Sequence, residues 1–423
     1  MREYGDVVRL VVGPPGLRFE LYCVFSPDGV QRVLAGSRDA YSKGNRGYRE
    51  IAGVFGHGLL TSEGALWQRQ RRLIQPLFTR RQIAGYATLM ADEAAAAASR
   101  WDGPVVIDAH AEMTRLTLRV VGRAIFGEDV ERAVPVIRRT FPVLTRYAIK
   151  RVLSPINPPA SWPTPASVRA DRARGALYAL ADDLIVRRRR AGIDGDDLLS
   201  RLLAARDADT GEAMDTQQIR DEALVFLLAG HETTSTALTF ALQLLGRHLD
   251  EQERAANEVA DVLGDRPPRI EDLPALDRTR MVLKEALRLY PPAYAFSRLA
   301  ERDDEIGGYR IPAGSFVVVS QWATHRHPGV WADPEEFRPE RFTAEREAER
   351  HRYAYFPFGG GPRACIGSHF AMQEAQIALA TILQRYRIRA RLASVPLDTT
   401  GITLRPQTAV PIEVSPLRRS SRG

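Results

Sequence analysis

The stretch between residues 216 and 249 constrains the fold of this chain more than any other. Its apolar side chains repeat with helical spacing, and Asp215 just before it is a residue type that caps helix N-termini. At about 1.5 Å per residue, such a helix is roughly 50 Å long, which is the width of a globular molecule of this size. Because its middle is apolar on nearly every side, we expect it to run through the protein centre.

A polar run, GHETT at 230–234, interrupts this helix at its most buried point. Glycine destabilises a helix interior by about 1 kcal/mol relative to alanine, and a buried carboxylate needs a partner. Two ordinary explanations remain open: the Thr233 hydroxyl bonds back to the carbonyl of Ala229, and Glu232 reaches a surface. The concentration of such residues at one place nevertheless favours a functional bulge in the helix.

The remaining pattern predicts a mainly α protein with small β-sheets, an α+β class. From about residue 64 to 260 the apolar periodicity predicts a series of helices, interrupted by one proline-rich loop at 156–167. No linker composition divides the chain, so we expect a single domain over residues 1–423 with no fused reductase. The strand signals are VVRLVV and FELYCVF before residue 26, followed by a helix, and later EIGGYRIPAG, SFVVVSQ and ITLRP.

Composition and charge exclude several classes of function. The chain is 44% hydrophobic, but no apolar run reaches the roughly 18–20 residues that span a bilayer. Its net charge of +7 is dispersed among acidic residues, and RRRR at 187–190 suits the C-terminal end of a helix, so we expect no nucleic-acid partner. With two cysteines and no signal peptide, the protein is expected to be cytoplasmic.

Cys365 is the cysteine expected to carry chemistry, whereas Cys23 lies in a strand-like apolar stretch and is expected to be core. A glycine-rich loop, residues 359–361, leads through Cys365 into a helix that begins near Ile366. The N–H groups at a helix N-terminus favour a thiolate there, and glycines let the backbone approach a flat or bulky group. Arg363 is placed to pair with an anion at the same site.

Two alternative readings of this segment are weaker. Residues 359–364 fit a dinucleotide-binding fingerprint, but no strand of a βαβ unit precedes them and no suitable acid follows. Cys365 and His369 have the spacing of half a zinc site, to which His325 and His327 would have to add ligands. No second cysteine lies nearby to complete that site.

Five motifs in order carry a resemblance to the cytochrome P450 family of haem-thiolate monooxygenases. The run Phe358, Gly361, Arg363, Cys365, Gly367 is similar to its haem-binding signature, and AGHETT at 229–234 resembles its oxygen-activation motif. The other three matches are WQRQR at 67–71, EALR at 285–288 and PERF at 339–342. The residues of the cysteine-loop and PERF motifs most resemble those of the eukaryotic-like bacterial branch of the family. Most of the family's usual N-terminal helix is missing from the start, which we expect to be shortened.

The resemblance implies the cytochrome P450 fold, with the long central helix over haem b, and assigns the site residues. Cys365 would ligate the iron, and Glu232 and Thr233 would be catalytic, relaying protons and bonding to bound dioxygen. The propionates would be held by Arg71, Arg298 and Arg363, with Trp67 adding an indole N–H. The remaining assignments are Ala229, Phe358 and Gly367 as further haem contacts, and, for the substrate pocket, Phe226, Ala229, Ala295, Phe296 and Ile402.

The same resemblance implies a structural network and several partners. Glu285, Arg288 and Arg341 should form a buried ion-pair network that locks the cysteine loop, so they are excluded from the catalytic set. Electrons should come from a ferredoxin or flavodoxin with its NAD(P)H reductase, docking near Arg69, Arg72, Arg80 and Arg81. The substrates would be dioxygen and a lipophilic small molecule. A haem-thiolate peroxygenase or isomerase, a haem sensor without turnover and a non-haem binding protein remain alternatives.

Overall fold

The computed structural model describes residues 3–13, 18–36, 39–127, 133–154, 157–159, 161–192, 195–207 and 209–417. Residues 156 and 160 of the predicted proline-rich loop lie outside the described residues. The described α-helices are α1 (Pro27–Ala35), α2 (Arg46–Phe55), α3 (Gly64–Ile74), α4 (Arg80–Ala84), α5 (Ala87–Ala98), α6 (Ala109–Phe126), α7 (Val134–Leu153), α8 (Pro165–Ala191), α9 (Leu198–Ala204), α10 (Thr216–Leu245), α11 (Leu249–Leu263), α12 (Asp277–Leu289), α13 (Gln321–Thr324), α14 (Ala344–Glu349) and α15 (Ser368–Leu383).

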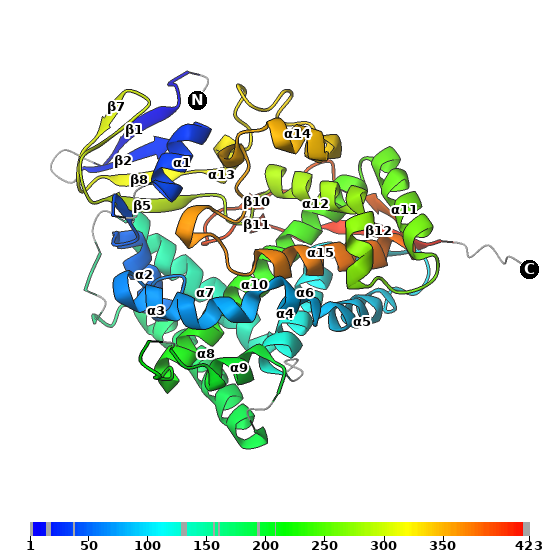
Figure 1. Ribbon diagram of the computed structural model, residues 1–423, viewed down its shortest axis with the longest axis horizontal. Helices are drawn as coiled ribbons and strands as arrows, with labels where there is room; N and C mark the ends of the chain where they lie inside the picture. The colour runs from blue at the N-terminus through cyan, green and yellow to red at the C-terminus, as the bar shows by residue number, and fades with distance from the viewer. Residues whose placement is uncertain are drawn as a thin grey trace, which may run out of the picture.

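The described strands form small sheets at the edge of this helical body (Figure 1). The largest has the order β1-β2-β8-β5-β3, in which β2 runs parallel to β8 and the other neighbours are antiparallel. A second sheet has the order β4-β12-β9, and two hairpins pair β6 with β7 and β10 with β11. The strands are β1 (Val7–Val12), β2 (Phe19–Val24), β3 (Tyr41–Ser42), β4 (Val105–Asp108), β5 (Phe296–Ala300), β6 (Asp304–Ile306), β7 (Tyr309–Ile311), β8 (Phe316–Val319), β9 (Tyr386–Ala390), β10 (Leu397–Asp398), β11 (Arg405–Pro406) and β12 (Pro411–Pro416).

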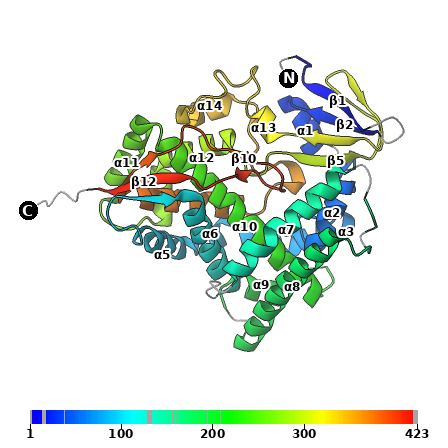
Figure 2. The ribbon, with the colours of Figure 1, turned by 180° about the vertical axis from the view of Figure 1, so that it is seen from behind.

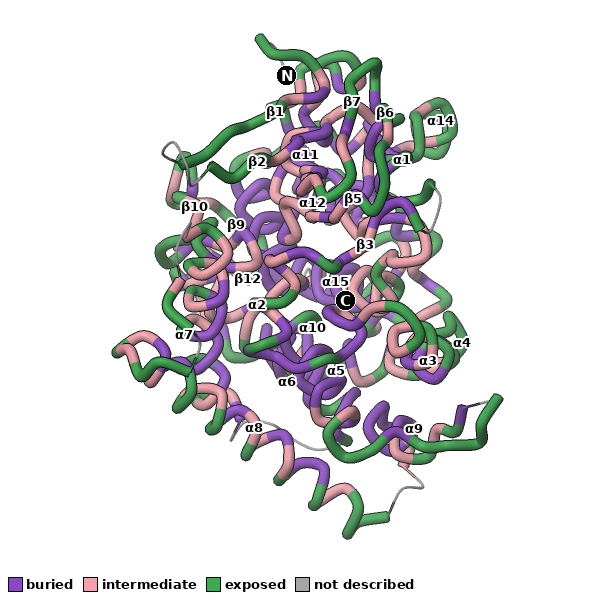
Figure 3. Tube along the Cα trace, turned by 90° about the vertical axis from the view of Figure 1, so that its left-hand side faces the viewer, coloured by how far each residue is buried: buried purple, intermediate pink, exposed green. Residues whose placement is uncertain are grey.

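The long helix predicted from the sequence is α10, and it lies at the centre as expected. Asp215 caps it by accepting a hydrogen bond from the Gln218 N–H. α6 packs along α10, and the two helices take part in both large hydrophobic clusters of the core, so the trace around them is mostly buried (Figure 3). The predicted class, mainly α with small sheets, is therefore confirmed.

Two predicted helix boundaries were wrong, and one strand that interrupts the helical half was missed. α10 ends at Leu245 and not at 249, because the carbonyl of Gly246 accepts from the Ala390 N–H and a Cβ on Gly246 would lie 2.5 Å from that nitrogen. β4 interrupts the helical half and was missed; it pairs with β12, which lies toward the viewer when the molecule is seen from behind (Figure 2). α8 begins at Pro165, inside the predicted loop, with Thr164 as its cap.

Candidate functional site

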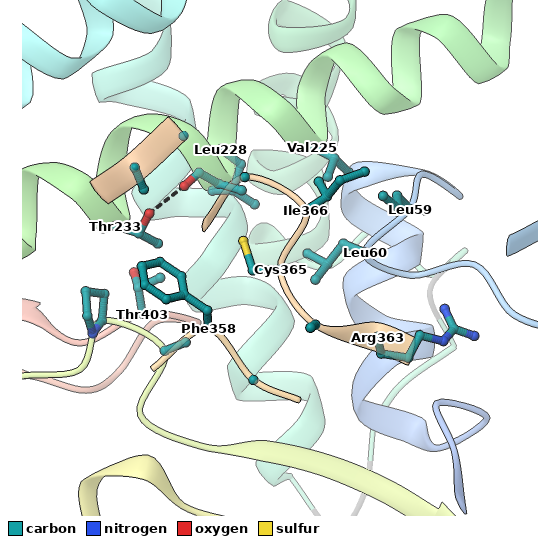
Figure 4. Close-up of a pocket in the computed structure, with 18 of the residues that line it drawn as sticks. Leu59, Leu60, Val225, Leu228, Thr233, Phe358, Arg363, Cys365, Ile366 and Thr403 are labelled. Carbon is teal, nitrogen blue, oxygen red and sulfur yellow. Dashed lines mark hydrogen bonds between the residues drawn. The ribbon is translucent and has the colours of Figure 1, made fainter. Parts of the chain in front are cut away.

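Cys365 lies in a loop that other parts of the chain fix from both sides. The Cys365 N–H donates to the carbonyl of Phe358 at 2.8 Å, which closes a turn around the glycines. Gly361 has a φ of +65°, and a Cβ there would lie 2.0 Å from the carbonyl oxygen of Leu34 in α1. α15 begins three residues after Cys365, at Ser368. The loop is thereby held so that the sulfur points into a cavity (Figure 4).

The thiol of Cys365 does not have the lowered pKa that its place before a helix suggests. Removal from water raises its pKa, and the Gly367 N–H and the charge of Arg71 offset this only partly. The sulfur is accessible from the cavity yet lies deep inside the protein, so desolvation outweighs the helix N-terminus. Such a thiol needs a bound cation, such as a metal ion, to be fully ionised at neutral pH.

Three predicted propionate partners, Arg71, Arg298 and Arg363, line the same cavity. Arg71 Nη1 donates to the Ala364 carbonyl at 3.2 Å, which ties α3 to the cysteine loop. Arg298 Nη1 lies 3.2 Å from the hydroxyl of Tyr48. The guanidinium of Arg363 stacks 3.9 Å from the ring centroid of Trp67, so the predicted indole donor is also at the cavity wall.

Lys43 is a fourth cation of this group, and the sequence analysis missed it. Its ammonium donates to the Leu60 carbonyl at 2.7 Å and is almost fully buried at the cavity wall. Burial, together with the neighbouring Arg298 and Arg363, lowers its pKa well below the usual range. Glu63 is the carboxylate paired with this group, at 2.8 Å from Arg363. The sequence offered one signal for Lys43: it is one of only three lysines in a chain whose other basic residues are arginines, so a lysine at this position stands out.

These residues fit a haem group. Four cations and one carboxylate leave a surplus of positive charge, and two propionates would neutralise most of it. The glycines of the loop leave space on one side, and Phe358, Gly367 and Cys365 face that space together. The cavity has a volume of about 560 Å³ and is lined mainly by apolar side chains, as a porphyrin requires.

The central helix passes over the cavity with Ala229, Gly230, Thr233 and Thr234 at its wall. The predicted bulge is absent: α10 is a continuous α-helix through these residues. The Thr233 hydroxyl donates to the Ala229 carbonyl at 2.6 Å, so the first of the ordinary explanations holds (Figure 4). The hydroxyl of Thr234 is buried and has no partner among the described residues. A Cβ on Gly230 would lie 2.9 Å from Val121 of α6, which explains the glycine by packing.

Glu232 points away from the cavity and is not part of its wall. Its Oε1 lies 3.4 Å from Arg405 of β11, which also pairs with Asp398 at 3.0 Å. Its Oε2 is buried without a partner in the described chain. His110 of α6 is close enough for the charge of Glu232 to act on it, although burial lowers the pKa of that imidazole overall. The structure therefore brings Thr233 and Cys365 to one cavity but places the carboxylate of Glu232 outside its wall.

The predicted substrate-pocket residues all line the cavity. Three elements bring together Phe226 and Ala229 of α10, Ala295 and Phe296 at the start of β5, and Ile402 before β11. Ile149 and Val152 of α7 add to the wall and were not predicted. Segments that lie far apart in the sequence thus line one apolar cavity.

The acidic and basic residues of α12 form the expected buried ion pairs, but their further hydrogen bonds go to residues 325–341 and, among the described residues, none goes to the cysteine loop. Glu285 and Arg288 are fully buried and make two hydrogen bonds, at 2.6 and 2.8 Å. Arg341 Nε lies 3.3 Å from Glu285, and the Arg338 N–H donates to Glu285 at 2.9 Å. The network touches no part of the cavity wall, which agrees with its exclusion from the catalytic set.

Neither alternative reading of the cysteine segment is borne out. Within the described ranges, no three His, Cys, Asp or Glu side chains come together as a metal site. His325 accepts from the Phe356 N–H and His327 pairs with Asp6, so neither approaches Cys365. The glycine loop follows a short helical turn, η4 (Arg352–Ala354), and not a strand.

The four arginines expected to receive a redox partner fall into two groups. Arg69 pairs with Glu212 at 3.4 Å, and Arg72 pairs with Asp207 at 3.2 Å. Arg80 and Arg81 on α4 are exposed, and Arg80 Nε lies 3.5 Å from His369 in the first turn of α15. Of the four, Arg80 and Arg81 make no ion pair among the described residues, and Arg80 lies against the first turn of α15, which follows the cysteine loop.

Two further observations bear on the predicted partners. In the described part of the chain, no helix combines the length and the apolar character that crossing a bilayer requires. Of the arginines at 187–190, Arg187 pairs with Asp183, Arg188 with Asp197, and Arg189 with the hydroxyl of Thr216. The run lies at the C-terminal end of α8, as predicted, and three of its four arginines are engaged within their own chain.

Comparisons with known proteins agree with this geometry. The family model described as Cytochrome P450 matches residues 1–411. Cyclooctatin synthase of Streptomyces melanosporofaciens is 41% identical over 98% of this chain and 89% of its own length. Pentalenene oxygenase of Streptomyces avermitilis is 36% identical over 92% and 85%, respectively. A crystal structure of the cytochrome P450DA heme domain has a TM-score of 0.85 at 30% identity, covering 98% of this chain and 90% of that one.

Proposed function

The chain belongs to the cytochrome P450 family, and from that premise we propose that it oxygenates a cyclic terpenoid hydrocarbon or a derivative of one. It is a haem b monooxygenase that inserts one oxygen atom from dioxygen into a lipophilic small molecule. Two relatives are named cyclooctat-9-en-7-ol 5-monooxygenase and pentalenene oxygenase, and these names denote a cyclic unsaturated alcohol and an unsaturated hydrocarbon. These names support the substrate class.

One observation carries the proposal: the Cys365 sulfur and the Thr233 hydroxyl share one apolar cavity. When bound, haem with a thiolate ligand supplies the reductive cleavage of the O–O bond. The chain's own residues do the rest. Cys365 would hold the iron, and Arg71, Arg298, Arg363 and Lys43 would hold the two carboxylates. The apolar wall excludes water and orients a substrate that has few polar groups.

Thr233 is proposed to handle protons as a hydrogen-bond acceptor. Its own proton is engaged with the Ala229 carbonyl, so the lone pairs of its oxygen are free to hold a proton-bearing group in the cavity. Glu232 is proposed as the acid that replenishes protons from the side of Arg405 and Asp398, where its carboxylate lies. It acts through its neighbour on the helix, because its carboxylate does not line the cavity.

A spectroscopic titration tests the substrate class. Cyclic terpenoid hydrocarbons and alcohols added to the haem-loaded protein are expected to shift the iron from low to high spin, because they displace water from an apolar cavity. Straight-chain fatty acids of equal carbon number serve as the matched control and should give a much weaker shift. A shift with the fatty acids and none with the terpenoids would overturn the proposed substrate class.

Replacing Thr233 by alanine should uncouple electron use from product formation. Without the acceptor, nicotinamide consumption should continue while product per nicotinamide falls by about tenfold or more and hydrogen peroxide appears. Glu232→Gln should slow the reaction, since an amide does not cycle a proton. Thr234→Ala is the control, because its side chain lies about 100° further round the helix. If Thr233→Ala stayed tightly coupled and Thr234→Ala became uncoupled, the role would belong to Thr234 and not to Thr233.

A ferredoxin or flavodoxin with its NAD(P)H reductase is proposed as the electron source. Such partners are commonly acidic, and of the exposed Arg80 and Arg81 on α4, Arg80 lies against the first turn of α15, which follows the cysteine loop. Reversing both charges with glutamate should slow reduction of the haem, measured by rapid mixing, by about tenfold or more at low salt. High salt should remove most of the difference.

Two other exposed arginines provide the control for this experiment. Charge reversal at Arg189 and Arg190, at the end of α8, changes the net charge equally and should leave the reduction rate unaltered. Equal effects of the two double variants would mean that docking follows overall charge and not the α4 surface.

We also propose a cytoplasmic location, since both cysteines are unpaired and a reducing compartment keeps Cys365 available. We further propose that residues 1–423 form one domain.

A further inference from the structure

Residues 56–62 form a short segment between α2 and α3 that we call the cavity strap. Leu59 and Leu60 of the strap line the cavity, on the side of Cys365 where Val225 and Ile366 also lie (Figure 4). The strap backbone makes no sheet, so its N–H groups must find other partners. Two of these groups are bound by adjacent acids of α10, Asp221 and Glu222.

Asp221 holds the first half of the strap. Its Oδ2 accepts from the His57 N–H at 2.8 Å, and its side chain is buried. The strap fits against it only because Gly56 has no side chain: a Cβ there would lie 2.2 Å from the Asp221 carboxyl carbon. Gly56 also has a φ of +81°, which favours glycine. A Cβ on Gly58 would lie 2.8 Å from Val225, one turn further along α10.

Glu222 holds the second half. Its Oε2 accepts from the Leu59 N–H at 3.0 Å, and its side chain is fully buried. Its Oε1 has no hydrogen-bond partner among the described residues. A carboxylate in such a place is costly unless it is protonated, and burial raises the pKa of Glu222 to about 8.

We propose that Asp221 and Glu222 are positioning residues that hold the cavity strap closed and thereby set the shape of the substrate space at Leu59 and Leu60. Neither side chain lines the cavity, so each acts through the strap backbone and not on the substrate itself. The proposal rests on the proposed function only for the identity of what occupies that space.

The strap is expected to loosen as pH rises. In the closed form Glu222 binds a proton, whereas in an opened strap its carboxyl meets water and returns to its ordinary pKa of 4.5. Opening therefore releases a proton between pH 4.5 and about 8, and each pH unit in that window favours opening by up to about tenfold. Above about pH 8 the closed form is ionised as well, and the dependence levels off.

Other titratable groups surround this pair. Asp221 is the charged neighbour that acts on Glu222, and burial raises its pKa as well. Asp215 and Arg220 of α10 and His57 of the strap act on Asp221 in turn, and Asp221 also raises the pKa of Tyr178 in α8. Because His57 lies in the strap and acts on Asp221, the share of Glu222 must be isolated with a variant that keeps His57.

The experiment compares Glu222→Gln and Glu222→Leu with the wild-type haem-loaded protein. The amide of glutamine keeps an oxygen for the Leu59 N–H but has no proton to release, whereas leucine removes the acceptor. Glu374→Gln is the matched control, since Glu374 of α15 is another buried carboxyl with a raised pKa and makes no contact with the strap in the described structure. Hydrogen exchange of amides 56–62 is followed by mass spectrometry between pH 5 and 9 and corrected for intrinsic exchange.

Two azoles report on the cavity at the same time. Clotrimazole is bulky enough to occupy the cavity that Leu59 and Leu60 line, whereas imidazole needs only the iron. In Glu222→Leu we expect strap exchange about tenfold faster at every pH and clotrimazole binding weakened several-fold, with imidazole affinity unchanged. In Glu222→Gln we expect the closed strap at every pH, without the wild-type slope. Glu374→Gln should retain that slope.

Each outcome decides the question. An unchanged pH slope in Glu222→Gln, or wild-type exchange without a pH slope, overturns the proposal. If Glu222→Leu does not fold, the glutamine variant still gives the test, because it preserves shape and hydrogen bonding. Equal losses of imidazole and clotrimazole binding would indicate disturbed haem loading and would also overturn it. Azole ligation requires only haem, so failure of the terpenoid substrates leaves this test unaffected.

Discussion

Replacing Cys365 with histidine is expected to abolish the strongly red-shifted Soret band of the reduced carbon monoxide complex. A thiolate opposite the carbon monoxide alters the electronics of the haem in a way that imidazole does not, and it also favours O–O cleavage. Oxygenation of any substrate should fall below detection in the same variant. The measurement is the reduced-minus-oxidised difference spectrum under carbon monoxide, made on protein with matched haem content.

Cys23 provides the control for this experiment. It is buried in β2, and desolvation raises its pKa to about 11, so it stays a neutral thiol. Cys23→Ala should therefore keep the full red-shifted band. A normal thiolate spectrum in the Cys365 variant would show that another residue holds the iron.

Replacing Glu285 with alanine is expected to destabilise the fold by about 3–5 kcal/mol. The change removes the partner of a fully buried guanidinium, Arg288, and the acceptor for the Arg338 N–H. A loss of that size is a large share of the total stability of a domain, so little haem-loaded protein should be recovered. Thermal or denaturant unfolding of the soluble fraction, with haem content measured in parallel, gives the result.

The ion pair between Lys284, next to Glu285 on α12, and Glu347 of α14 is the matched comparison. Lys284 contacts Glu347 at 2.6 Å, with both side chains partly exposed. Solvent screens such a pair, so Glu347→Ala should lower stability by about 1 kcal/mol or less. Equal stability losses in the two variants would show that the Glu285 network matters no more than a surface contact.

The sequence predicts the backbone of this protein better than it predicts the direction of its side chains. The N-terminus of α10 follows from one residue, because Asp215 caps it locally. Its C-terminus is fixed by Gly246 meeting Ala390, a contact between residues far apart in the chain, which periodicity does not reveal. Local signals thus fix where the helix starts, and tertiary contacts fix where it ends.

The same division explains the candidate site. Cys365, Thr233, Arg71 and Arg363 were found because each sits in a motif of fixed spacing. Lys43 was missed because it comes from a two-residue strand edge with no pattern around it. The direction of Glu232 depends on Arg405, more than 170 positions later, and the raised pKa of Cys365 depends on burial by many segments. Neither the direction of Glu232 nor the pKa of Cys365 can be predicted from the residues that neighbour it in the sequence.

The parallel pairing of β2 with β8 has a consequence for how the protein is made. It joins Leu21–Val24 to Phe316–Val319, and the cysteine loop in turn presses Gly361 against α1. During synthesis, β2 can pair with β1 at once, but its other edge stays unpaired while most of the chain is translated, because β8 has not yet been made. Haem capture is accordingly a late event in biogenesis, and the nascent N-terminal segment is the part that most needs a chaperone.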